Sequence, residues 1–189
     1  MAKKKERCAW CGDDPLYVAY HDEEWGVPIY DSRDLFAKLI LDGAQAGLAW
    51  ITILRKREGY YKAFAGLNPH KMARFSEQRI EKILQDPGIV RNRLKVQSAV
   101  KNAKAYVALE KQGIEFSGFL WSFVNHTPIR NKWPSMKHVP AVTPEAEAMS
   151  KALKKAGFSF VGPTIVYAFM QAVGMVNDHV VTCPQYSKC

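Results

Sequence analysis

Two pairs of metal-ligand side chains lie at opposite ends of the chain, Cys8 with His21 and His179 with Cys183. A Cys₂His₂ set is a preferred tetrahedral environment for zinc, and the second pair has the i, i+4 spacing of one helical face. Four protein ligands leave no open coordination position. The pattern therefore predicts a structural ion that ties the N-terminus to the C-terminus, and the chemistry must come from other side chains.

A third nearby thiol leaves the ligand set open at this point. Cys11 forms a Cys-x-x-Cys pair with Cys8, so Cys8, Cys11, His179 and Cys183 would make an equally plausible Cys₃His site. Reduced thiols and surface histidines without a metal are the other interpretation. Cys189 is expected to be free. With four cysteines in 189 residues, and no apolar segment after the basic start of the chain, we expect a cytosolic metalloprotein.

Aromatic side chains crowd the N-terminal third of the sequence: Trp10, Tyr17, Tyr20, Trp25 and Trp50. Some could belong to an ordinary core. Aromatic rings with polar groups also suit a pocket that stacks on a flat ligand, and a cationic ligand above all.

Acidic residues are the remaining candidates for chemistry. Asp42 follows the apolar positions of a predicted helix and precedes Gly43, where it could face a cleft. His21 and Glu23 match the His-x-Glu half of a zinc deaminase, but the Pro-Cys-x-x-Cys that should follow downstream is missing. The sequence therefore argues against a metal-activated water.

Charge and hydropathy restrict the class of partner. The chain has 27 basic and 18 acidic residues, for a net charge of +9. Such an excess favours a polyanion, with nucleic acid first and an acidic membrane surface second. The apolar runs are short and interrupted by charge, so no membrane-spanning segment is expected.

Helical spacing dominates the elements that must position these residues, and strand alternation is nearly absent. We predict helices that open at or near Asp31, Gln45, Asn68, Ser76, Thr143 and Gly162, the first of which ends near Asp42 and Gly43. A long helix carries Val96, Val100, Ala103 and Val107 and ends at Gly113. Residues 125–142, with three prolines, are expected to form an ordered surface loop. The predicted fold is all-α.

Residues 83–95 read as a helix, a tight turn at Gly88, and a second helix with a basic start at Arg91, Arg93 and Lys95. Unpaired backbone N–H groups at such a start can donate to a phosphate, and the cations add attraction. This arrangement is that of a helix-hairpin-helix, which grips DNA backbone. A plain helical hairpin with a solvated basic face is the alternative.

Several long blocks resemble one known family over about residues 6–186, in order and with similar spacing. They are Cys8-Ala9-Trp10, Asp14-Pro15-Leu16-Tyr17, Tyr20-His21-Asp22, Glu24-Trp25-Gly26-Val27-Pro28, Gln45-Ala46-Gly47-Leu48-Ala49-Trp50, Leu120-Trp121-Ser122-Phe123-Val124, Ser150-Lys151-Ala152-Leu153-Lys154-Lys155 and Asn177-Asp178-His179. On these blocks the chain resembles the bacterial 3-methyladenine DNA glycosylase I family.

The resemblance implies an all-helical helix-hairpin-helix glycosylase with a structural zinc ion held by Cys8, His21, His179 and Cys183. It implies a base pocket formed by Tyr20 and Trp50, with Trp10, Tyr17 and Trp25 around them. Gln45 and Gly47 are expected at the DNA. Leu48 matches the apolar residue that enters the gap left by the extruded nucleotide, which offsets part of the cost of unstacking.

Two positions depart from the family pattern, which usually has glutamate at Asp42 and serine at Ala49. The family's acid contacts the edge of the extruded adenine, and aspartate is shorter by about 1.5 Å. We expect a closer backbone, a bridging water or weaker base affinity. Alkylated adenine is already cationic and leaves easily, so stacking on Trp50 and edge contacts from Asp42 and Tyr20 are expected to suffice.

The resulting expectation is a monomeric, cytoplasmic bacterial enzyme that acts on double-stranded DNA containing alkylated adenine and does not bind membranes. It would form one domain over residues 1–189, with a helix-hairpin-helix lobe at about 33–112 and a zinc-bearing lobe from 1–32 and 113–189. A non-enzymatic, zinc-stabilised DNA-binding module and a zinc-dependent hydrolase or deaminase are the rival hypotheses.

Overall fold

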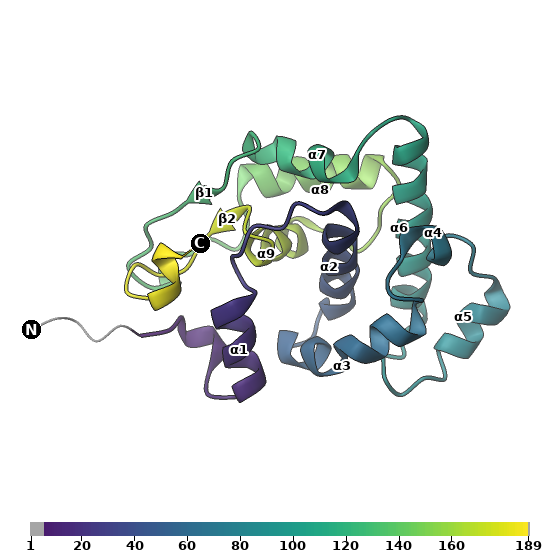
Figure 1. Cartoon of the computed structure of the whole chain (residues 1–189), viewed down its shortest axis with the longest axis horizontal. Helices are drawn as coiled ribbons and strands as arrows, with labels where there is room; N and C mark the ends of the chain where they lie inside the picture. Colours follow the sequence, from purple (N-terminus) through teal and green to yellow (C-terminus); the bar gives the residue numbers. More distant parts are fainter. Residues whose placement is uncertain (1–5, 189) are drawn as a thin grey trace, which may run out of the picture.

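The computed structural model describes residues 6–188, and the predicted all-α architecture is confirmed there (Figure 1). Cys189, expected to be free, lies outside the described residues. The α-helices are α1 (Pro15–Glu23), α2 (Ser32–Gln45), α3 (Trp50–Ala63), α4 (Pro69–Met72), α5 (Glu77–Ile83), α6 (Arg93–Lys111), α7 (Phe116–Trp121), α8 (Pro144–Lys155) and α9 (Pro163–Ala172). Short 3₁₀ turns are η1 (Ala9–Cys11), η2 (Ser122–Val124), η3 (Met136–His138) and η4 (Pro184–Ser187).

Side-chain caps explain where most of these helices begin. Asp31, Asn68, Ser76 and Thr143 each accept a hydrogen bond from a backbone N–H of the first turn that follows, as their positions in the sequence predict. The predicted long helix is also confirmed, and Gly113 follows it with a positive φ of 75°.

The predicted boundary between the first two helices, near Asp42 and Gly43, is wrong. α2 runs on through Asp42 and Gly43 to Gln45, and α3 begins only at Trp50. Gly43 lies inside the helix, where an added Cβ would be 3.4 Å from the Cβ of Phe160. Asp42 therefore projects from within a helix, not from its end.

α2 lies at the centre of the molecule, between α9 on one side and α6 on the other (Figure 1). Its apolar face, with Leu35, Phe36 and Leu39, is fully buried in the main core. α9 contributes Val166, Phe169 and other apolar side chains to the same core. α2 and α9 also carry residues of the site described below.

The predicted hairpin consists of α5, a turn and α6, and it is seated on α3 by two glycines. A Cβ added to Gly59 of α3 would lie 2.2 Å from the carbonyl oxygen of Gly88 in the turn. Only glycine permits this approach, so the hairpin turn and α3 are held together at backbone contact. Lys56 adds a hydrogen bond from its Nζ to the carbonyl of Pro87, at 2.6 Å.

The two ends of the described chain come together on one side of the molecule (Figure 1). Within the loop at residues 125–142, the strand β1 (Ile129–Arg130) pairs in parallel with β2 (Val176–Asn177). This pairing ties the loop to the C-terminal segment. Among the described residues, no helix combines the length and the apolar character that crossing a membrane requires.

Candidate functional site

Four predicted ligands from the two ends of the chain meet in one buried cluster. Their ligand atoms, from Cys8, His21, His179 and Cys183, lie within 4.8 Å of one another, and all four residues are buried. The predicted set is confirmed as a group that could hold a metal ion. Cys11 is not part of it, because its thiol lies 3.2 Å from the carbonyl oxygen of Cys8 and donates there.

Each histidine of the cluster holds its second ring nitrogen against a fixed acceptor. Nδ1 of His21 lies 2.7 Å from a carboxylate oxygen of Asp22, and Nε2 of His179 lies 3.1 Å from the carbonyl oxygen of Trp25. These partners leave Nε2 of His21 and Nδ1 of His179 facing the thiols. Such anchoring orients an imidazole as a metal ligand.

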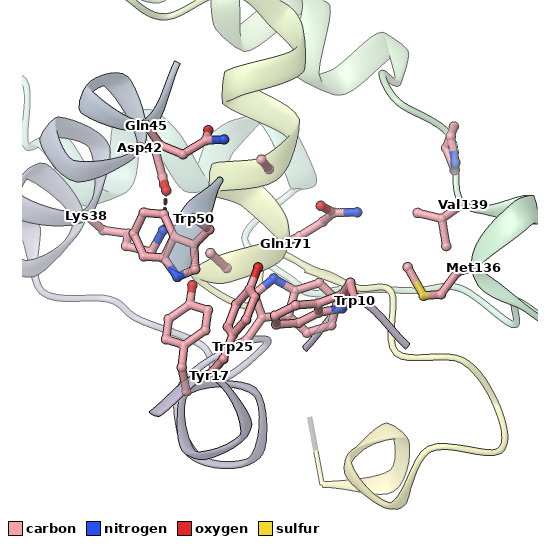
Figure 2. A pocket seen from close by; sticks show the side chains of 14 residues that line it. Trp10, Tyr17, Trp25, Lys38, Asp42, Gln45, Trp50, Met136, Val139 and Gln171 are labelled. Carbon is pink, nitrogen blue, oxygen red and sulfur yellow. Dashed lines mark hydrogen bonds and ion pairs between the residues drawn. The ribbon is translucent and has the colours of Figure 1, made fainter. Parts of the chain in front are cut away.

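A pocket of about 370 Å³ opens beside this cluster, and all five predicted aromatic residues line it (Figure 2). The rings of Tyr20 and Trp50 lie 5.4 Å apart, and Trp10 lies 5.1 Å from both Tyr17 and Trp25. The volume is within the range of small-molecule sites. The rings therefore line a pocket, and Tyr20 and Trp25 are also buried in a small hydrophobic cluster.

The metal-ligand cluster supports one wall of the pocket. The ring of His179 meets the ring of Trp25 edge-on at 4.6 Å, and the ring of His21 lies 5.2 Å from that of Trp10. Both histidines of the cluster therefore contact rings that line the pocket.

Asp42 reaches the pocket from α2 and is nearly fully buried. Burial raises the pKa of its carboxyl group, and Lys38 offsets this only in part. One carboxylate oxygen accepts from Lys38; the other, Oδ2, has no partner among the described residues. Burial, with the charge of Asp42, also raises the pKa of Tyr20 well above its ordinary value, so the phenol stays neutral.

Lys38 is a site residue that the sequence analysis missed. It precedes Asp42 by one helical turn, and its Nζ lies 4.1 Å from the centre of the Trp50 ring. The i, i+4 spacing of opposite charges on a predicted helix was the signal that could have found it.

Other missed residues come from distant segments. Met136, Val139 and Pro140 bring the loop at residues 125–142 to the pocket, so this loop does more than cover the surface. Gln171 and Ala172 line it from the end of α9. No local sequence pattern predicts these contacts, because they depend on how distant segments of the chain pack together, as where β1 of the loop pairs with β2.

A buried carboxylate behind the pocket joins several of these elements. Asp178 is fully buried and accepts hydrogen bonds from the side chains of Asn131, Trp133, Tyr167 and Gln171, at 2.5 to 2.8 Å. Four donors satisfy a charge that would otherwise be costly to bury. The network joins the loop and α9 next to His179 of the metal-ligand cluster.

The predicted DNA-contacting residues lie at two neighbouring turns. Gln45, Gly47 and Leu48 join α2 to α3; Gly47 has a φ of 75°, and Leu48 is 36% exposed. Lys95, at the start of α6, donates from Nζ to the carbonyl oxygens of Ala44 and Ala46, at 2.8 and 2.7 Å. The hairpin thereby holds the turn that carries Leu48.

The remaining hairpin residues have mixed surroundings. Arg91 is exposed, and Arg93 is exposed but pairs with Glu81. The backbone N–H of Gly88 donates to the carboxylate of Asp86 at 2.7 Å. Contact of these residues with DNA stays a prediction.

Comparisons with known proteins agree with this geometry. The family model for methyladenine glycosylase matches residues 10–186. The chain is 52% identical to the DNA-3-methyladenine glycosylase of Haemophilus influenzae, over 94% of this chain and 96% of that protein. It is also 52% identical to DNA-3-methyladenine glycosylase 1 of Escherichia coli, over 96% of this chain and 97% of that protein.

Solved structures match over the same length. A crystal structure of 3-methyladenine DNA glycosylase I is 50% identical, with a TM-score of 0.93, over 95% of this chain and 98% of that chain. A structure of the Staphylococcus aureus enzyme, described for its recognition of 3-methyladenine, is 39% identical with a TM-score of 0.93, over 97% of each chain. By sequence and by structure, the chain belongs to the methyladenine glycosylase family.

Proposed function

We propose that this protein is a DNA-3-methyladenine glycosylase, which extrudes the damaged nucleotide, hydrolyses its bond to the sugar and leaves an abasic site. The observation that carries this proposal is the pocket of about 370 Å³ lined by five aromatic residues and by the buried acid Asp42. The full-length likeness to enzymes named for this activity supports it.

Each pocket residue has a role that its position supports. Trp50 and Tyr20 would stack on the extruded base, with Trp10, Tyr17 and Trp25 closing the far wall. Asp42 would accept a hydrogen bond from the amino group of the base through Oδ2. The base already carries positive charge from its methyl group, so departure needs no strong general acid. Water then attacks the sugar carbon as the bond to the base breaks.

The proposed ion is zinc, with a structural role. With bond lengths of about 2.3 Å to sulfur and 2.0–2.1 Å to nitrogen, tetrahedral zinc holds its sulfur and nitrogen ligands about 3.6 Å apart. The thiol sulfurs and facing imidazole nitrogens here lie 3.5 to 3.6 Å apart. Four protein ligands leave no position for substrate, so this cluster does not favour the zinc hydrolase or deaminase hypothesis.

The proposed partner is double-stranded DNA, bound by a monomer in the cytoplasm. The net charge of +9 favours a polyanion. Leu48 and Gly47, with Gln45, are placed at an exposed turn next to the pocket, where Leu48 could fill the space of the extruded nucleotide. The DNA backbone would be contacted by the hairpin residues Gly88, Arg91, Arg93 and Lys95. Lys95 would contribute mainly by holding the α2–α3 turn through its two hydrogen bonds.

A base-release assay tests the proposed activity. Duplex DNA treated with a methylating agent is incubated with the protein, and the released bases and abasic sites are measured together. We expect free 3-methyladenine, an equal number of abasic sites and almost no unmodified adenine. The variant Trp50→Leu should bind duplex DNA but release about 5- to 160-fold less base, since one stacked base is worth about 1–3 kcal/mol.

The same assay separates the rival hypotheses. Binding of duplex without base release would support the non-enzymatic DNA-binding module. Release of ammonia, with the bases still attached, would support a deaminase. Equal release of methylated and unmodified adenine would overturn selection by the charge of the base.

A further inference from the structure

A lysine that is paired with the acid also lines the base pocket. Lys38 lines the pocket, its side chain is only 13% exposed, and its Nζ lies 4.1 Å from the centre of the Trp50 ring. Figure 2 shows Lys38 and Asp42 joined beside that ring. A surface lysine would reach water instead, so the burial of this ammonium group requires an explanation.

The ion pair changes the electrostatics of the pocket. Among the residues that line it, Lys38 and Asp42 are the ones with formal charge, and the charges cancel. Burial also lowers the pKa of Lys38 and raises that of Asp42, and each partner offsets part of the other's shift. The attraction of an isolated carboxylate for a cationic base is thus largely removed. Hydrogen bonds to the edge of the base can then contribute to the recognition of adenine.

The pair presents a donor beside an acceptor. An ammonium group has three N–H donors, of which one is directed at Asp42. The carboxylate has Oδ2, which is buried and has no partner among the described residues. Adenine carries the complementary pattern on one edge, since N7 accepts and the N6 amino group donates. Guanine has two acceptors there, N7 and O6, so its O6 would face the carboxylate.

We propose that Lys38 is a specificity-determining residue that donates a hydrogen bond to N7 of the extruded base while Asp42 accepts one from N6. This inference rests on the proposed function, because it adds a residue that recognises the edge of the base in the same pocket. It also addresses the presence of aspartate at position 42, where the family usually has glutamate. The ammonium group of Lys38 would supply a polar contact to the base that the shorter side chain of Asp42 alone does not make.

The experiment measures binding of two free bases by quenching of tryptophan fluorescence. The first is 3-methyladenine, and the second is 7-deaza-3-methyladenine, in which a C–H replaces N7. Each base is titrated into the wild-type protein and into Lys38→Met, which keeps an unbranched side chain, one atom shorter, but removes its charge and donors. Lys151→Met, at an exposed lysine of α8, serves as the matched control. Thermal melting and bound metal are checked for each variant.

We expect wild type and Lys151→Met to bind the deaza base at least tenfold more weakly than 3-methyladenine, as befits a lost charge-assisted hydrogen bond. Lys38→Met should bind both bases equally and weakly. Equal affinity of the wild type for both bases, or an unchanged preference in Lys38→Met, would overturn the inference. If the wild type still releases 3-methyladenine from DNA, only this inference fails; if it neither binds nor releases the base, the proposed function fails too.

Discussion

At the scale of single residues, the site depends on where charge is buried. Asp42 sits within α2 and next to Lys38, so its carboxylate meets an aromatic pocket and a cation together. This differs from an acid at a helix end, which water would screen. We therefore expect substitutions at this position to affect both base binding and folding, so the two effects are measured separately.

The variant Asp42→Asn should bind 3-methyladenine more weakly and keep partial activity. The amide retains an acceptor oxygen but loses the charge that holds Lys38, so we also expect a loss of about 1–3 kcal/mol in the free energy of unfolding. Fluorescence titration, base release and urea denaturation give the three quantities. The matched variant Asp42→Glu, with the acid usual in the family, should keep full activity. Complete inactivity of Asp42→Asn with unchanged base binding would mean that Asp42 acts directly in the chemistry.

At the scale of elements, the hairpin and the α2–α3 turn form one connected unit. Gly88 of the hairpin contacts Gly59 of α3, and Lys95 of α6 holds the carbonyl oxygens of Ala44 and Ala46 at the end of α2. A shift of the hairpin should therefore move the turn that carries Leu48.

The variant Gly59→Ala tests this connection. Its methyl group would meet the backbone of Gly88 at 2.2 Å, so the hairpin must move, at a cost of about 1–3 kcal/mol in the free energy of unfolding. We expect weaker duplex binding with little change in the affinity for free 3-methyladenine, measured by anisotropy and fluorescence. Gly162→Ala is the control, since an added Cβ there would meet nothing within 4 Å and its φ is −62°. Wild-type duplex affinity in Gly59→Ala would contradict the coupling.

Local signals allowed most helices to be predicted, and long-range contacts explain the rest. Caps such as Thr143 act within one turn, so sequence alone reveals them. α1 was missed although Asp14 caps it, because its buried residues do not form a regular apolar stripe. The aromatic residues and the four ligands were found from their types, whereas Met136 reaches the pocket only through the fold of a distant loop.

At the scale of the whole molecule, the metal-ligand cluster has two roles. It brings the two chain ends together, and it packs against the wall of the base pocket. Its histidines contact Trp10 and Trp25 directly. We infer that the chain acts as one domain. Its two proposed lobes both contribute residues to the pocket; one lobe covers about 33–112, and the other covers 1–32 and 113–189.

Loss of the proposed ion should thus affect both stability and binding. We expect Cys183→Ser to lose the bound ion, to melt at a lower temperature and to bind 3-methyladenine more weakly, because Trp25 loses its support. Cys11→Ser is the matched control: its hydroxyl can still donate to the carbonyl of Cys8, and it should keep the ion. Elemental analysis, thermal melting and base titration check these outcomes. If Cys183→Ser keeps wild-type base affinity after losing the ion, the cluster does not shape the pocket.

The position of the ligands also determines how the protein would respond to force. Cys8 and Cys183 lie near the two ends of the chain. With an ion between them, tension applied to the termini would pass through metal–thiolate bonds and bypass the helices in between. A molecule stretched by its ends should resist until those bonds rupture and then lengthen in one large step, whereas the metal-free protein should extend at lower load.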